Sequence, residues 1–223
     1  MVEDLRAIYA RRFQDIDKER NGIWRLLARS YFQKWVRPTD TVVELGAGYC
    51  EFINNIQATH KFALDLNPAT RSKAGPDVQV ISQDVRRRWA LESETVDVVF
   101  SSNFFEHLRS KKDLARCLQE GYRVLRRGGL LIAMGPNIRV CPDIYWDFFD
   151  HYLPLSDRSM LEAMLLAGFE KQLVIPRFLP FTMARRRPPA PFLVRLYLSM
   201  PVFWYVLGKQ FMIVCRKPAR LSA

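Results

Sequence analysis

A glycine-rich turn that directly follows a run of apolar residues is the segment of this sequence best suited to approach a ligand closely. Residues 41–45 predict a buried strand, and Gly46, Ala47 and Gly48 follow it. Glycine lacks a Cβ and permits tight backbone geometry, and the start of a following helix offers free N–H groups. In a doubly wound α/β sheet, ligands bind beyond the carboxyl ends of the strands. We therefore expect this turn to line a binding site.

Two acidic residues follow the next two predicted strands. Asp65 comes after residues 61–64, about 20 residues beyond the turn, where a carboxylate can accept hydrogen bonds from ribose hydroxyls. Asp84 follows residues 78–81 and is placed to meet an adenine edge. An acid after a strand is also often a helix cap or a turn residue, and this alternative stays open for either acid alone. The glycine turn and both acids in this order favour a ligand that contains adenosine.

Glu51 separates two possible adenosine ligands. The dinucleotide fingerprint is GxGxxG, and Glu51 stands where its third glycine belongs. A carboxylate at the start of a helix would also sit badly against a pyrophosphate. S-adenosylmethionine has no phosphates, and an acidic neighbourhood helps to hold its cationic amino-acid portion. The sequence therefore favours S-adenosylmethionine over a nicotinamide dinucleotide.

The elements that must position these residues alternate along the chain. Strands are predicted at residues 41–45, 61–64, 78–81, 96–100, 130–134, 169–175 and 211–215. Helical stretches are predicted at residues 50–57, 111–125 and 157–167. Continuous apolar strands separated by amphipathic helices indicate βαβ units and a parallel sheet covered on both faces. The expected fold class is a doubly wound α/β domain.

The length of 223 residues fits one domain, residues 1–223. We divide it into an N-terminal helical cap (1–37, with a break at Asn21-Gly22), a cofactor-binding core (40–175), a basic and apolar insertion (176–209) and a final strand (210–217). The apolar stretch 192–207 is shorter than the roughly 20 residues of a membrane span, so we expect a buried or interfacial helix. Four scattered cysteines without a CxxC predict neither a metal site nor disulfides, and favour a cytoplasmic location.

Over roughly residues 40–175 the chain resembles the class I, Rossmann-like S-adenosylmethionine-dependent methyltransferases. The resemblance rests on the run Glu44–Cys50, on Val96–Leu108 and on Arg123–Gly129; Cys50 departs from it, because the family has a third glycine there. It implies S-adenosylmethionine as cofactor, S-adenosylhomocysteine as product, no metal, and a seven-stranded, mostly parallel sheet of order 3-2-1-4-5-7-6 whose last strand is antiparallel. The implied cofactor contacts are Glu44 ordering the turn, Gly46, Ala47 and Gly48 beneath the methionine portion, Asp65 on the ribose, Leu66 against the adenine, Asp84 and Val85 at the adenine edge, and Ser102 and Asn103 near the methyl donor.

His151 is the candidate catalytic residue. A methyltransferase mainly aligns a nucleophile with the methyl group, and a general base is needed only if the acceptor must lose a proton early. Related methyltransferases often carry a histidine between the fifth strand and the next helix, where His151 lies beside Asp147 and Asp150. A packed histidine bonded to backbone is the open alternative. We expect His60 to begin a strand far from the site, and His107 to make structural hydrogen bonds.

The charge pattern bears on the acceptor. The net charge is +11, and Arg185–Arg187 precede the apolar stretch 192–207. This pairing, and a similarity to bacterial methyltransferases of glycan and glycolipid pathways, favour O-methylation of a small or lipid-linked acceptor. Residues 185–207 would contact the inner face of a membrane or form a lid over the pocket. The alternatives are an RNA methyltransferase, disfavoured because the arginine runs lack interleaved aromatics, and a non-catalytic basic binding module. The sequence does not determine the oligomeric state.

Overall fold

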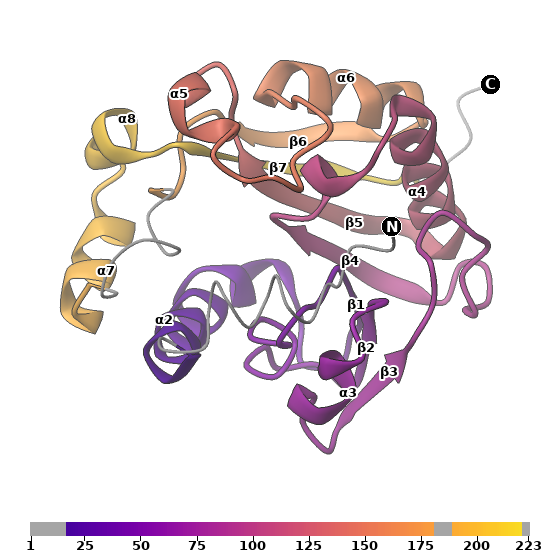
Figure 1. The fold of residues 1–223 in the computed structure, drawn as a ribbon. Helices are drawn as coiled ribbons and strands as arrows, with labels where there is room; N and C mark the ends of the chain where they lie inside the picture. The colour runs from indigo at the N-terminus through magenta and orange to yellow at the C-terminus, as the bar shows by residue number, and fades with distance from the viewer. Residues whose placement is uncertain (1–16, 181–188, 220–223) are drawn as a thin grey trace.

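A computed structural model of the chain describes residues 17–180 and 189–219. The first part of the expected helical cap and the triplet Arg185–Arg187 lie outside the described residues. Within them, seven strands form one sheet of order β3-β2-β1-β4-β5-β7-β6 (Figure 1). The strands are β1 (Thr41–Leu45), β2 (His60–Leu64), β3 (Val78–Ile81), β4 (Val96–Ser102), β5 (Leu125–Pro136), β6 (Glu170–Ile175) and β7 (Gln210–Arg216).

Strands β1 to β5 pair in parallel, and β7 runs antiparallel to both of its neighbours, β5 and β6. The expected fold class and strand order are therefore confirmed. Parallel strands are connected by crossovers, so the carboxyl ends of β1, β2 and β4 meet at one edge of the sheet. The glycine turn, Asp65 and Asn103 all lie at this edge.

The helices are α2 (Asp17–Ser30), η1 (Phe32–Trp35), α3 (Ala69–Lys73), η2 (Phe105–His107), α4 (Lys111–Val124), α5 (Pro142–Tyr145), α6 (Asp157–Leu166), α7 (Pro191–Ser199) and α8 (Val202–Leu207). Serine side chains cap the two long helices at the back of the sheet: Ser110 accepts from the N–H of Asp113 before α4, and Ser156 forms a capping box with Ser159 before α6. Helices α4 and α6 cover one face of the sheet and α2 covers the other (Figure 1).

Two hydrophobic cores, one on each face, explain why the strands are continuously apolar. In β1, Val42 belongs to the core that contains Leu27 of α2, whereas its neighbour Val43 belongs to the core that contains Leu118 of α4. Successive side chains of a strand point to opposite faces, so a strand buried on both sides shows no alternation of apolar and polar residues. The two cores therefore explain the continuous apolar runs from which a sheet covered on both faces was predicted.

The helix predicted at residues 50–57 is wrong, because residues 48–55 form consecutive turns. Cys50 has a φ of +61°, which interrupts right-handed helical geometry at its start. The N–H of Ile53 then donates to the Glu44 carboxylate at 3.0 Å instead of continuing a helical ladder. A side chain from β1 therefore replaces the hydrogen bond that a regular helix would need.

The break predicted at Asn21-Gly22 is also wrong, because α2 runs through both residues. The side-chain oxygen of Asn21 accepts a hydrogen bond of 2.8 Å from Asn55, so the residue anchors the helix to the turn region. Packing of the apolar face of α2 on the sheet outweighs the weak helix propensity of this pair.

The apolar stretch 192–207 forms two helices rather than one. Helix α7 ends at Ser199, Pro201 precedes α8, and most apolar side chains of both helices are exposed. Proline supplies no N–H and clashes with the preceding turn, so one continuous helix is not possible there. None of the helices in the described parts of the chain has the length and hydropathy that a membrane span requires.

Candidate functional site

A cavity of about 480 Å³ opens where β1 and β4 end. One end is lined by the glycine turn Gly46–Gly48, with Ser102 and Asn103 beside it. The other end is lined by Glu106, His107 and His151. Seven of the sequence-predicted site residues meet in its wall: Glu44, Gly46, Ala47, Gly48, Ser102, Asn103 and His151.

The glycine turn has the left-handed geometry that its composition suggested. The φ angles are +63° at Gly46 and +53° at Gly48. A Cβ at position 46 would overlap the ring of Phe104, so this position requires glycine for space as well as for conformation. Cys50, which stands where the related family has its third glycine, also has a positive φ. The chain therefore keeps the backbone shape of the motif despite the substitution.

Glu44 organises the turn from below. Its buried carboxylate accepts the N–H of Ile53 at 3.0 Å and so fixes residues on the far side of the turn. Burial raises the pKa of Glu44 well above its ordinary value, and the nearby carboxylates of Glu51 and Asp65 raise it further. The geometry agrees with the turn-ordering role that the resemblance implied.

Asp65 links the turn to the end of β2. One carboxylate oxygen accepts the N–H of Gly48 at 2.7 Å, and the other accepts the N–H of Asn67 at 2.6 Å. Burial raises the pKa of Asp65, and the hydrogen bonds from Asn67 and Gly48 partly oppose this shift. The adjacent Leu66 is 54% exposed, which leaves an apolar side chain open beside the carboxylate. The ribose and adenine contacts of these residues stay predictions.

Asp84 and Val85 lie apart from the cavity. The carboxylate of Asp84 accepts hydrogen bonds from the Arg86 guanidinium at 2.6 and 2.9 Å, and this pairing lowers the pKa of Asp84. Val85 is buried in the core beneath α4. None of Asp84, Val85, Asp65 and Leu66 lines the cavity. The cavity therefore brings together the residues expected to contact the methionine portion of the cofactor, whereas the residues expected to contact its ribose and adenine lie outside the cavity wall.

Asn103 brings a buried polar oxygen to the cavity wall. Its φ is +50°, its N–H donates to the carbonyl of Met134, and its side-chain N–H donates to Ser102. The side-chain oxygen of Asn103 is buried and has no hydrogen-bond partner among the described residues. A buried acceptor without a partner costs free energy, and a cationic or N–H-bearing ligand in the cavity would satisfy it. S-adenosylmethionine carries both a sulfonium and an ammonium group, so this oxygen fits it.

Arg20 and Glu51 form a site feature that sequence reasoning missed. Arg20 on α2 donates to the Glu51 carboxylate at 2.6 Å, both residues are buried, and both line the cavity beside the glycine turn. We had assigned the carboxylate alone to the cationic amino-acid portion of the cofactor. The pair instead presents both charges, which complements the ammonium and the carboxylate of an amino acid. No pattern distinguishes Arg20 from the other 33 of the 34 lysines and arginines in the sequence.

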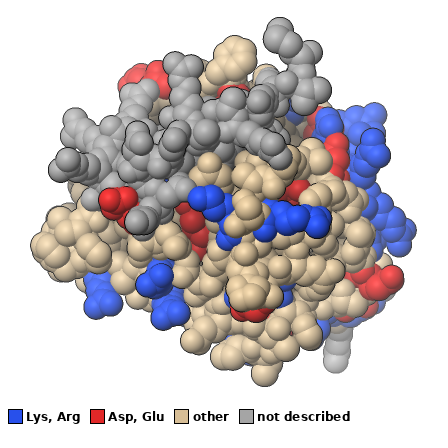
Figure 2. Space-filling model, turned by 60° about the horizontal axis from the view of Figure 1, so that its bottom comes forward, with Lys and Arg blue, Asp and Glu red and all other residues tan. Residues whose placement is uncertain are grey.

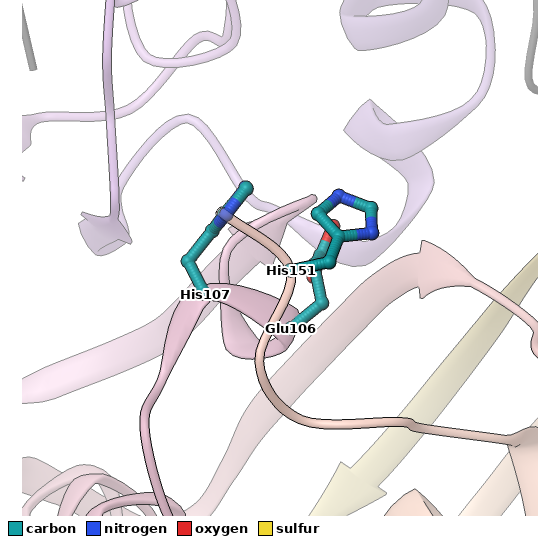
Figure 3. Close-up of side chains that lie close together, drawn as sticks. All are labelled: Glu106, His107 and His151. Atoms are coloured by element: carbon teal, nitrogen blue, oxygen red, sulfur yellow. The ribbon is translucent and has the colours of Figure 1, made fainter. Parts of the chain in front are cut away.

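Glu106, His107 and His151 meet at the acceptor end (Figure 3). The backbone oxygen of Glu106 accepts the N–H groups of Tyr152 and Leu153 at 2.9 and 3.0 Å, and this ties the loop that carries His151 to η2. The imidazole of His151 is buried and stacks on Phe148, with ring centroids 4.9 Å apart.

His107 has the structural hydrogen bond expected for it and also lines the cavity. Its Nδ1 lies 2.8 Å from the backbone oxygen of Asp150 and 3.3 Å from the Asp150 carboxylate. His107 and His151 have ring centroids 5.0 Å apart. Sequence reasoning missed Glu106 as a site residue, although its place directly before His107 was visible. His60 begins β2 and is exposed, as expected.

The rest of the cavity wall is mostly apolar, although Gln210 of β7 also lines it. Ile23, Trp24 and Leu27 contribute from α2, Val194 from α7, and Phe203 from α8. Helices α2 and α7 contact each other, so the insertion and the N-terminal helix enclose the cavity together. The acceptor side can therefore hold a sizeable apolar group next to the polar cluster.

Comparison with known proteins agrees with this geometry. Residues 43–133 match the family described as methyltransferase domain. A search of curated proteins finds no match. The matched segment runs from β1 to β5 and contains the glycine turn, Asp65, Asp84 and Asn103.

Many solved structures have a similar fold. A complex between a methyltransferase activator and a methyltransferase from Haloferax volcanii is similar over 98% of this chain and 100% of the other, with a TM-score of 0.72 and 18% identity. An S-adenosylmethionine-dependent methyltransferase of Thermotoga maritima is similar over 93% and 97%, with a TM-score of 0.66 and 18% identity. The geranyl diphosphate C-methyltransferase of Streptomyces coelicolor, solved with Mg²⁺, geranyl diphosphate and S-adenosylhomocysteine, is similar over 92% and 81%, with a TM-score of 0.61 and 12% identity. At these identities the likeness shows a shared fold.

Proposed function

We propose that this chain, which carries a methyltransferase domain on the class I, Rossmann-like fold, transfers a methyl group from S-adenosylmethionine to an oxygen of a small or lipid-linked acceptor. The observation that carries the proposal is the single cavity that joins the glycine turn to the cluster of Glu106, His107 and His151. A methyl donor and an acceptor bound in one cavity can be aligned for in-line displacement.

At the donor end, the residues of the chain fit S-adenosylmethionine. The turn Gly46–Gly48 provides a close backbone approach, the Arg20–Glu51 pair complements the amino-acid portion, and the Asn103 oxygen receives a cationic group. Asp65 is placed for the ribose at the next strand end. When bound, the cofactor supplies an electrophilic methyl group on its sulfonium, and S-adenosylhomocysteine is the product.

At the acceptor end, His151 is the residue that we propose to assist loss of the acceptor proton. An alcohol is a weak nucleophile until its O–H bond breaks, so a polar group must act where the methyl group arrives. His151 lines the cavity in the same loop as Asp150, and the backbone of Glu106 holds that loop in place. This position favours an oxygen acceptor over a neutral amine, whose nitrogen can attack the methyl group before it loses a proton.

The enclosing helices favour an acceptor with an apolar portion. The part of the cavity wall formed by α7 and α8 is largely apolar, and α2 adds Ile23, Trp24 and Leu27 besides Arg20. Outside the cavity, α7 and α8 expose Phe192, Val202, Tyr205 and Val206. Exposed apolar helices next to a basic segment suit contact with an anionic membrane surface, from which a lipid-linked acceptor could enter. We therefore extend the proposal to a peripheral membrane contact through residues 185–207, of which the structure describes 189–207.

RNA as acceptor finds less support. Figure 2 shows the Lys and Arg side chains of one face in several groups separated by uncharged and acidic residues. The run Arg86–Arg88 is exposed, yet Arg86 is engaged by Asp84. A single-stranded nucleic acid is usually bound along a continuous basic groove with aromatic stacking platforms.

The test is incubation of the protein with S-adenosylmethionine labelled on the methyl group and with fractionated cell extract. We expect label in a lipid or glycan fraction. Label confined to RNA, or to no fraction, would overturn the proposal. Calorimetry with S-adenosylhomocysteine separates an enzyme from a non-catalytic module, which would not bind it.

A further inference from the structure

Glu106, His107 and His151 are close enough to act on one ion. One potential ligand atom from each residue lies within 4.8 Å of the other two. Glu106 and His107 come from η2 and His151 from the loop before α6, so two segments of the chain converge at this point (Figure 3). Glu106 and His151 are buried and His107 is half-buried.

The donor set is typical of a catalytic divalent metal. Two imidazoles and one carboxylate bind zinc or iron and leave positions open for a further ligand. Bonds of about 2.0–2.2 Å place the ligand atoms of a tetrahedral ion about 3.3–3.6 Å apart. The three groups lie within 4.8 Å of one another, so they must approach by at most about 1.5 Å to share an ion. With two neutral imidazoles and one carboxylate as ligands, a bound divalent ion has a lower net charge than the bare cation, so its burial costs less free energy.

The environment of His107 supports the same conclusion independently. Its Nδ1 faces two oxygen acceptors, the backbone carbonyl and the carboxylate of Asp150. A backbone carbonyl oxygen cannot donate, so Nδ1 carries the N–H of this hydrogen bond, and Nε2 is the ring nitrogen that can bind an ion. Metal-binding histidines are held in this way by a carboxylate or a carbonyl on the other ring nitrogen.

We propose that Glu106, His107 and His151 bind a divalent first-row transition metal ion of the zinc or iron class at the acceptor end of the cavity. Our sequence interpretation expected no metal, because the four cysteines are scattered without a CxxC. This proposal rests on the proposed function in one respect: the coordination position that the three residues leave open on the ion would face the acceptor oxygen.

A bound ion would help the acceptor hydroxyl to lose its proton. Coordination of the acceptor hydroxyl favours its ionised form. The O–H bond breaks and the proton passes to solvent; the O–CH₃ bond then forms as the S–CH₃ bond breaks, and that electron pair stays on sulfur. His151 would then act on the acceptor proton as a metal ligand instead of accepting the proton itself.

The test uses tag-free, metal-free protein titrated with Co²⁺, whose visible absorption reports imidazole coordination, followed by competition with Zn²⁺. We expect one equivalent to bind, and Glu106→Gln, His107→Ala and His151→Ala each to weaken binding at least about tenfold. His60→Ala, at the exposed start of β2, is the matched control and should bind as the unaltered protein does. Absence of Co²⁺ and Zn²⁺ binding, or equal binding by all four variants, would overturn the proposal.

Calorimetry with S-adenosylhomocysteine on the same samples distinguishes a variant that has lost only the metal from a variant that has failed to fold. A variant that loses the metal and still binds S-adenosylhomocysteine is folded, so its loss counts for the metal site. Protein that binds S-adenosylhomocysteine but no metal contradicts only the metal site. Protein that binds the metal but no S-adenosylhomocysteine contradicts only the proposed methyl transfer.

Discussion

The carboxylate of Asp65 accepts a hydrogen bond of 2.7 Å from the backbone N–H of Gly48, which joins the end of β2 to the turn after β1. The two sequence features that indicated an adenosine-containing ligand are therefore in direct contact. The protein itself therefore holds Asp65, the residue proposed to accept the ribose hydroxyls, in place relative to the glycine turn, and this would reduce the ordering cost of cofactor binding.

Replacement of Asp65 by Asn should weaken S-adenosylhomocysteine binding roughly 10- to 100-fold, the range expected for a lost charge-assisted hydrogen bond of about 1.5–3 kcal/mol. The amide cannot accept from Gly48 and Asn67 with both of its polar atoms. Calorimetry measures the change. Asp77→Asn, which changes the exposed partner of the buried Lys61, is the control and should leave affinity for S-adenosylhomocysteine unchanged. Equal affinities for the two variants would remove Asp65 from the cofactor site.

Gly46→Ala should destabilise the protein, and Gly22→Ala should stabilise it. The first adds a Cβ that overlaps Phe104 at a φ of +63°, which costs at least about 1–2 kcal/mol. The second adds a Cβ that meets nothing within 4 Å in the middle of α2 and should contribute about 0.5–1 kcal/mol. Urea unfolding of both variants tests the contrast. Changes of the same sign would contradict the described turn or the continuity of α2.

Glu44→Gln should raise the free energy of unfolding at pH 7. Burial raises the folded-state pKa of Glu44, so the folded state binds the proton more readily than the unfolded state, and stability falls as pH rises through that interval. The glutamine oxygen still accepts from Ile53, but it carries no charge. The advantage of the variant should shrink as pH is lowered toward the unfolded value of about 4.3. Unfolding curves from pH 4 to pH 8 give the measurement, and an advantage that grows at acidic pH would refute the assignment.

His151→Ala should leave S-adenosylhomocysteine binding intact and lower the turnover about 10²- to 10⁴-fold, the usual contribution of a group that handles a proton. His151 comes from the loop before α6, whereas the glycine turn follows β1, so the two effects should separate. Turnover is measured with whichever fraction takes up label. Unchanged turnover would show that His151 is only a packed histidine.

Tyr205→Glu combined with Val206→Asp should reduce flotation of the protein with anionic liposomes. Both side chains lie on α8 and are 77% and 73% exposed. The control is Leu166→Asp, an 84% exposed apolar residue at the end of α6, which should float like the unaltered protein. If no protein floats with or without anionic lipid, the membrane contact is excluded.

The sequence predicted the sheet better than the site. Strand positions followed from apolar runs that two cores require, and β1 and β3 were predicted with the bounds that the structure has. The helix expected after the glycine turn failed because Cys50 adopts a glycine-like conformation, which its residue type does not announce.

The acceptor end could not be predicted for a different reason. Glu106 and His151 are far apart in the sequence, and they are brought together by hydrogen bonds from the loop to the Glu106 backbone and by the contact of His107 with Asp150. Arg20 likewise reaches Glu51 only because α2 packs on the sheet beside the turn. Contacts of this kind depend on tertiary packing, which leaves no periodic signal along the chain.

Strand β7 lies between β5 and β6, although it follows both of them in the chain. During synthesis, β5 and β6 therefore emerge from the ribosome before the strand that pairs with each of them, and both present unpaired backbone edges in the meantime. Such edges are templates for incorrect association. Gln210, the first residue of β7, lines the cavity, so the cavity wall is complete only when that strand docks. We expect the growing chain to acquire its binding site in the last step of folding and to depend most on chaperones just before it.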